Sequence, residues 1–79
     1  MSQVFSRAAI RERLFEMFGR FAVHKVPVGE ASTVAGDLGL DSINIMELVT
    51  ELEETFGLTI PDEEIAAIGT VGDAINAVA

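Results

Sequence analysis

Residues 42–56 read SINIMELVTELEETF and are followed by Gly57, and this stretch decides the fold. Placed at about 3.6 residues per turn, its largest apolar side chains fall in one sector roughly 100° wide, as in a helix that buries one face. These side chains are Ile45, Leu48, Val49, Leu52 and Phe56. Because glycine readily takes the left-handed backbone that closes a helix, we predict a helix over 42–56 that ends at Gly57.

The opposite sector of this helix carries side chains that folding alone does not explain. It holds Ile43, Met46, Glu47, Thr50 and Glu54, with Glu51 and Glu53 on its flanks. Ile43 and Met46 have two interpretations: they pack under a loop or a later helix, or they form an exposed apolar patch rimmed by acids, which suits a partner protein. Like charges one turn apart slightly disfavour a helix, so Glu47, Glu51 and Glu54 indicate an acidic surface offered to another protein.

The first helix is predicted over about residues 6–22, with Ser6 suited to cap it. Its apolar stripe consists of Ile10, Leu14, Met17, Phe18 and Phe21. Glu16 stands one turn before Arg20, so we expect these two side chains to pair along the helix. A long connection follows over residues 23–41, in which His24 is interpreted as an ordinary loop residue. Five apolar side chains are expected to hold this loop against the helices: Val26, Val28, Val34, Leu38 and Leu40.

The region after Gly57 predicts two more helices. Pro61 suits the first turn of a short third helix, which Gly69 stops. Thr70 and Asp73 form a capping-box pattern that starts the last helix. The apolar contacts come from Ile65 and Ile68 in the third helix and from Val71, Ile75 and Val78 in the last. We therefore expect an all-α protein: a four-helix bundle with a short third helix and a long loop between helices one and two, folded as a single domain over residues 1–79.

Charge and composition narrow the function classes. The chain has 79 residues, with thirteen Asp or Glu, five Lys or Arg and a formal net charge of −8. All five basic residues precede residue 26, and no Lys or Arg follows Glu30. Such an acidic segment repels nucleic acid and anionic membrane and attracts basic protein surfaces. The lack of cysteine excludes disulfides and thiolate metal sites and agrees with a cytoplasmic location, and no apolar run is long enough to span a membrane.

Ser42 opens the predicted helix and is the candidate for chemical modification. A serine at this position is commonly an N-cap, and position alone favours that interpretation. The same position also suits a phosphodiester, because unpaired backbone N–H groups and the positive end of the helix dipole stabilise an anion. Position therefore permits a modification of Ser42 without requiring it.

The residues around Ser42 resemble those of a known family. The stretch GDLGLDSI over residues 36–43, followed by MEL at 46–48, is similar to the attachment motif of acyl carrier proteins. The run LEETFGLTIPDEE over residues 52–64 is similar to that family's passage from the second helix to the third, and Thr70-Val71 to its entry into the last helix. The resemblance covers residues 36–79, more than half of the chain.

This resemblance implies an acyl or peptidyl carrier protein, which performs no catalysis itself. A phosphopantetheinyl transferase would move 4′-phosphopantetheine from coenzyme A onto Ser42, and the thiol of that group would carry acyl, aminoacyl or peptidyl cargo as a thioester. The further partners implied are an acyl- or aminoacyl-loading enzyme and a downstream synthase, transferase or thioesterase with a basic docking surface. The resemblance assigns Asp37 and Asp41 to engagement of the transferase. It assigns Ile43, Met46, Glu47 and Ile68 to partner recognition, and the helical wheel adds Glu51 and Glu54.

Other functions fit the residues less well. Ser42 lacks the Gly-x-Ser-x-Gly setting of a hydrolase, and a single histidine offers no evident base. The spacing of Asp37, Asp41 and Glu47 does not match an EF-hand, so no metal site is predicted. The main alternative is an unmodified, carrier-like acidic adaptor that docks on a basic partner. Fatty-acid, polyketide and peptidyl pathways all stay open for a carrier, and we expect a monomer.

Overall fold

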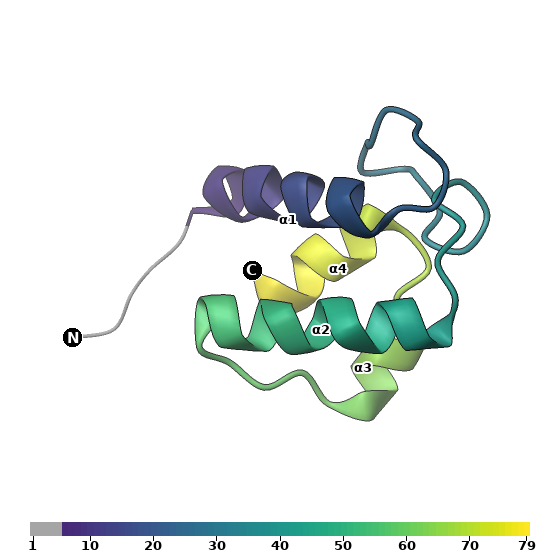
Figure 1. The fold of residues 1–79 in the computed structure, drawn as a ribbon. Coiled ribbons are helices and arrows are strands. Elements are labelled where there is room, and N and C mark those ends of the chain that lie inside the picture. The colour runs from purple at the N-terminus through teal and green to yellow at the C-terminus, as the bar shows by residue number, and fades with distance from the viewer. Residues whose placement is uncertain (1–5) are drawn as a thin grey trace.

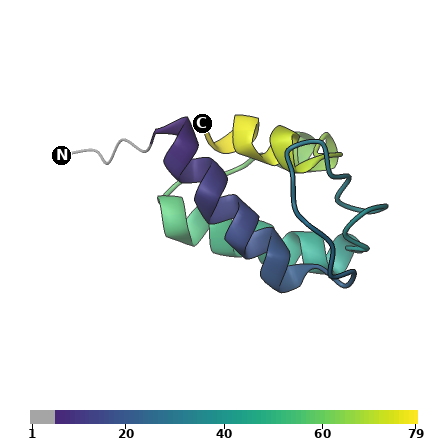
Figure 2. The same cartoon turned by 90° about the horizontal axis from the view of Figure 1, so that it is seen from above.

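The computed structural model describes residues 6–79, which form four helices and no strand (Figure 1). α1 spans Arg7–Phe21, α2 spans Ser42–Phe56, α3 spans Asp62–Ala66 and α4 spans Val71–Val78. α1 packs against both α2 and α4, and Figure 2 shows it crossing obliquely over α2. The prediction of an all-α fold with a short third helix is confirmed.

The core between α1, α2 and α4 is apolar, and no charged or polar side chain among residues 6–79 is buried in it. Each helix contributes the stripe that its sequence predicts. The buried members are Ile10, Leu14, Met17 and Phe18 of α1, Leu48, Val49 and Leu52 of α2, and Val71, Ala74 and Ile75 of α4. Ile45, Phe56, Phe21 and Val78 are partly buried and pack against these residues. One face of α2 is therefore committed to the core, which turns its opposite face outward.

The helix ends follow from local hydrogen bonds. Ser6 Oγ accepts the N–H of Ala9 at 3.1 Å and caps α1. Thr70 and Asp73 cap α4 with each side chain accepting the other's backbone N–H, both at 3.1 Å, as predicted. Pro61 stands one residue before α3 rather than in its first turn, because its ψ of 149° is that of an extended backbone. α3 has five residues and none of them is buried.

The long loop between α1 and α2 is anchored at two places. Val34, Leu38 and Leu40 are buried as predicted, and Val28 is partly buried. The prediction for Val26 is wrong, since this side chain is 45% exposed. Near it the loop is held by backbone instead: the N–H groups of residues 23 and 24 donate to the carbonyl oxygen of Leu38 at 2.9 and 3.2 Å.

The second anchor joins the loop to the start of α4. Val34 N–H donates to the carbonyl oxygen of Gly69, and Val71 N–H donates to that of Ser32, both at 3.0 Å. The N–H of Gly72 donates to the carbonyl oxygen of Glu30 at 2.9 Å. The loop is thereby fixed to the helices at the end of the molecule where α2 begins (Figure 1).

Candidate functional site

Ser42 is the first residue of α2 and is exposed. Its interpretation as the N-cap is wrong, because Asp41 occupies that position and its Oδ1 accepts the N–H of Asn44 at 2.8 Å. Asp and Ser are comparable caps, and the residue that keeps an extended backbone takes the role. Within residues 6–79 the hydroxyl of Ser42 makes no hydrogen bond. Since Asp41 supplies the cap, this hydroxyl is available for chemistry.

The first turn of α2 suits an anion attached to that hydroxyl. In the described part of the chain, no hydrogen bond uses the backbone N–H of Ser42 or Ile43. Both N–H groups stand at the positive end of the helix dipole, where phosphate oxygens are stabilised. A phosphodiester on Ser42 Oγ therefore fits the position, and these two N–H groups would be its nearest backbone donors.

The turn that leads into α2 is held by contacts from the preceding loop. Asp37 Oδ2 accepts the N–H of Thr33 at 2.9 Å, and Thr33 Oγ1 accepts the N–H of Asp37 at 2.8 Å. His24 Nδ1 lies 3.2 Å from the carbonyl oxygen of Asp37, and its ring lies against Gly39. His24 is thus not an ordinary loop residue. Sequence could not indicate this role, because 13 positions separate His24 from Asp37.

The outer face of α2, defined by Ile43, Met46, Glu47, Thr50 and Glu54, is exposed along the helix. Ile43 is 68% exposed and Met46 is 50% exposed. These two side chains therefore do not pack under the loop or under α3, and of the two interpretations the exposed patch is the correct one. Glu47 and Glu54 make no ion pair within residues 6–79.

The two flanking acids of α2 are engaged inside the molecule. Glu51 forms an ion pair with Arg20 of α1, and the expected pairing of Arg20 with Glu16 does not form. The packing of α1 on α2 places a carboxylate of another helix within reach of this arginine. On the other flank, Glu53 Oε2 accepts the N–H of Ile60 at 2.7 Å. The outer face is therefore less acidic than the sequence of α2 suggests.

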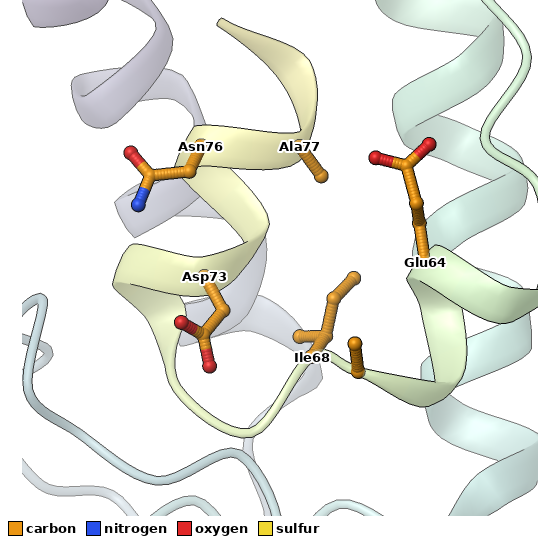
Figure 3. Close-up of a pocket in the computed structure, with 6 residues that line it drawn as sticks. Glu64, Ile68, Asp73, Asn76 and Ala77 are labelled. Carbon is orange, nitrogen blue, oxygen red and sulfur yellow. The ribbon is translucent and has the colours of Figure 1, made fainter.

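Ile68 lies in the connection between α3 and α4 and is partly buried. It lines an open hollow of about 240 Å³, in which its side chain points between Glu64 of α3 and Ala77 of α4 (Figure 3). This volume is below the roughly 300–1,000 Å³ of ordinary ligand pockets. Ile68 thus offers an edge of its side chain, rather than the whole of it, to a partner.

The shifted pKa values belong to groups that hold the fold. Hydrogen bonds from the Arg7 guanidinium lower the pKa of Glu30, and the backbone N–H groups of Gly69 and Thr70 lower the pKa of Asp73. Within residues 6–79, no three His, Asp or Glu side chains are placed to hold a metal ion. In the same residues no helix has both the length and the apolarity that crossing a bilayer requires.

Known proteins share this fold. An acyl carrier protein from Enterococcus faecalis is 31% identical, with a TM-score of 0.78 over 94% of this chain and 95% of that chain. A protein described as an acyl carrier protein from Mycobacterium tuberculosis is 30% identical, with a TM-score of 0.82 over 89% of this chain and 95% of that chain. The family model for the phosphopantetheine attachment site matches residues 21–78. The chain is a member of the acyl carrier protein family.

Membership in this family identifies the cofactor of the protein. The carrier protein holds 4′-phosphopantetheine covalently. Acyl carrier proteins are not catalysts, so the protein itself is not an enzyme. The predictions of family, fold, cofactor and lack of catalysis are confirmed.

Proposed function

We propose that Ser42 Oγ is the attachment point of 4′-phosphopantetheine and that the chain carries acyl, aminoacyl or peptidyl intermediates of fatty-acid, polyketide or related biosynthesis. In the attachment step a bond forms between Ser42 Oγ and the phosphorus that bears the pantetheine group. The bond from that phosphorus to the adenosine bisphosphate of coenzyme A breaks, and the serine proton passes to a base of the transferase. The step is a phosphoryl transfer that needs no redox partner.

The observation that carries this proposal is the state of the Ser42 hydroxyl. It is exposed and has no hydrogen bond within residues 6–79, because Asp41 caps the helix in its place. It also stands at a helix start where two backbone N–H groups are unengaged among the described residues. A transferase can therefore reach the hydroxyl without breaking a contact of the fold.

The partner surface that we propose starts beside this hydroxyl. Ile43 and Met46 offer exposed apolar contact, while Glu47 and Glu54 offer charge to the basic docking surface of a loading enzyme, synthase, transferase or thioesterase. Asp37 and Asp41 lie in the turn before Ser42 and are proposed to engage the phosphopantetheinyl transferase. Ile68 contributes the exposed edge described above.

The test is the intact mass of the protein after incubation with coenzyme A, magnesium and a broad-specificity phosphopantetheinyl transferase. We expect one phosphopantetheine on the wild type and none on Ser42→Ala. The variant is expected to fold with wild-type stability, because the hydroxyl that it lacks makes no hydrogen bond in the described chain. The matched control is Ser6→Ala, which removes an exposed serine at the start of α1 and should still be modified.

Two results would count against the proposal. Modification of Ser42→Ala would move the attachment point to another residue. An unmodified wild type, with the transferase active on a control carrier and with the cognate transferase also failing, would favour the acidic adaptor that docks without modification.

A further inference from the structure

Arg20 lies in the last turn of α1 and pairs with Glu51 at the edge of α2. Both side chains stay partly in water, with 57% of the Arg20 side chain and 36% of the Glu51 side chain exposed. The guanidinium is therefore accessible to a protein that binds the outer face of α2 and also contacts Glu51 on its flank. It places a positive charge beside a surface that the sequence of α2 alone would make uniformly acidic.

The acids of α2 fall into two classes as a result. Glu51 forms an ion pair with Arg20, and Glu53 Oε2 accepts the backbone N–H of Ile60. Glu47 and Glu54 have no ion pair among the described residues. Seven residues of helix separate them, which is a rise of about 10 Å. A partner cation thus meets two separated carboxylates on the outer face instead of a continuous acidic stripe.

We propose that Arg20 is a specificity-determining residue that gives the docking surface a positive edge along α1. The partner it fits has an apolar side chain for Ile43 and Met46 and two cations about 10 Å apart for Glu47 and Glu54. Opposite Arg20 this partner has an oxygen acceptor, a carboxylate or an amide, rather than a third cation. This inference rests on the proposed docking function of the outer face.

The physical reason is the cost of placing like charges together. A partner with a cation opposite Glu51 must displace the arginine or stand next to it, and either event weakens the encounter. A partner with an acceptor at that point gains a hydrogen bond to a guanidinium that keeps unused donors. Arg20 thus lowers the affinity for a uniformly basic surface and favours a surface that also carries an oxygen acceptor.

The first experiment does not depend on any modification. The ¹⁵N-labelled chain is titrated with tetralysine peptide at low salt, and the amide shifts of α2 are followed. In the wild type we expect shifts at Glu47 and Glu54 and a weak response at Glu51. In Arg20→Gln the affinity for the peptide, measured from the shift of the Glu51 amide, should rise about 1.5- to 5-fold, because an exposed ion pair changes a binding constant by a factor of this size.

Arg13→Gln is the matched control for this titration. It removes the same charge from the same helix, but Arg13 has no ion pair within residues 6–79 and lies by Thr55 and Phe56 at the far end of α2. The response at Glu51 should stay at the wild-type level in this variant. Equal responses of Glu51 in both arginine variants, or a wild-type response at Glu51 as large as that at Glu47, would overturn the proposal.

The second experiment uses the rate of modification by the transferase. With a transferase whose docking surface is uniformly basic, Arg20→Gln should be modified faster than wild type and Arg13→Gln at the wild-type rate. The gain should vanish in the Arg20→Gln/Glu51→Gln double variant. A wild type that is never modified would refute the attachment proposal and leave the titration to decide on Arg20, so the two failures are distinguishable.

Discussion

Gly39 lies three residues before Ser42 and has a positive φ of 73°. Glycine takes this left-handed backbone without the steric cost that a Cβ atom brings. A Cβ atom at this position would also lie 3.1 Å from Cε1 and 3.2 Å from both ring nitrogens of His24. Two independent features, backbone conformation and the histidine ring, therefore require glycine at residue 39.

We expect Gly39→Ala to lower the free energy of unfolding by more than the roughly 1–2 kcal/mol that the left-handed backbone alone costs an alanine. The part of the loss beyond that backbone cost measures the steric contact between the new methyl group and His24. In the His24→Ala background, the cost of Gly39→Ala should fall to the backbone term. Urea unfolding followed by circular dichroism provides both values.

Gly57→Ala is the reference for the backbone term. Gly57 has a φ of 65°, and nothing lies within 4 Å of a Cβ atom built on it. If Gly39→Ala costs no more than Gly57→Ala when His24 is present, the ring does not constrain the turn before Ser42.

Residue-scale prediction succeeded where a side chain's environment follows from its own helix. The exposure of Ile43 and Met46 follows from the angle between them and the core stripe, which is fixed by helical geometry. The two contacts that were not predicted, His24 on Gly39 and Arg20 with Glu51, join separate parts of the chain. Periodicity describes one element at a time, so such pairings require the packed structure.

At the element scale, the start of α2 depends on Asp41. Its carboxylate accepts the N–H of Asn44 at 2.8 Å, and the Asn44 side chain in return accepts the N–H of Asp41. We expect Asp41→Ala to lower the free energy of unfolding by about 0.5–2 kcal/mol, because an N-cap acceptor is lost. Asp41→Asn should retain nearly all the stability, since asparagine caps a helix equally well.

Chemical unfolding of the two variants distinguishes the stability that the Asp41 hydrogen bond contributes from the stability that its negative charge contributes. Equal losses of stability in both would show that the charge of Asp41, and not its hydrogen bond, holds the first turn. The same pair also tests the proposed role with the transferase: slow modification of a stable Asp41→Asn variant would assign that role to the negative charge.

The bounds of α2 were predicted correctly from sequence, because its apolar period is regular and Gly57 ends it. The cap was misplaced by one residue, since Asp41 and Ser42 are adjacent and both are good capping residues. α3 is the least predictable element: five residues with no buried side chain carry almost no periodic pattern. The residues on either side of it are anchored instead: Ile60 N–H donates to Glu53 Oε2, and the carbonyl oxygen of Gly69 accepts the N–H of Val34.

At the scale of the whole molecule, Glu30 joins three segments. Its carboxylate oxygens lie 3.0 Å from Arg7 Nη2 and 3.0 Å from Arg11 Nε, both on α1. Arg7 Nη2 also donates to Asn76 Oδ1 of α4 at 3.1 Å, and the carbonyl oxygen of Glu30 accepts the N–H of Gly72. Loop, first helix and last helix are therefore joined through the side chain and backbone of Glu30 and through Arg7. Part of the basic charge of α1 thus stabilises the fold and does not face a partner.

This carboxylate makes stability depend on pH in a defined direction. Hydrogen bonding from Arg7, with the charges of Arg7 and Arg11, lowers the pKa of Glu30 below its ordinary 4.5 in the folded protein. A lowered folded-state pKa contributes stability that is fully present above the ordinary value and is lost as pH falls through the folded value. Glu30→Gln should therefore melt a few degrees below wild type near neutral pH, and the difference should shrink below pH 4.5.

Thermal melts of wild type and Glu30→Gln across this range, at low and high salt, measure the effect. Added salt should reduce the difference, because the ion pairs are exposed. Glu54→Gln makes the same change in net charge at an acid without an ion pair in the described chain, so it shows what relief of acidic repulsion does by itself. If the difference between wild type and Glu30→Gln persists unchanged well below pH 4.5, the negative charge of Glu30 is not what stabilises the protein. If the two proteins melt alike at every pH, the loop is held by its backbone hydrogen bonds and its buried valine and leucines alone.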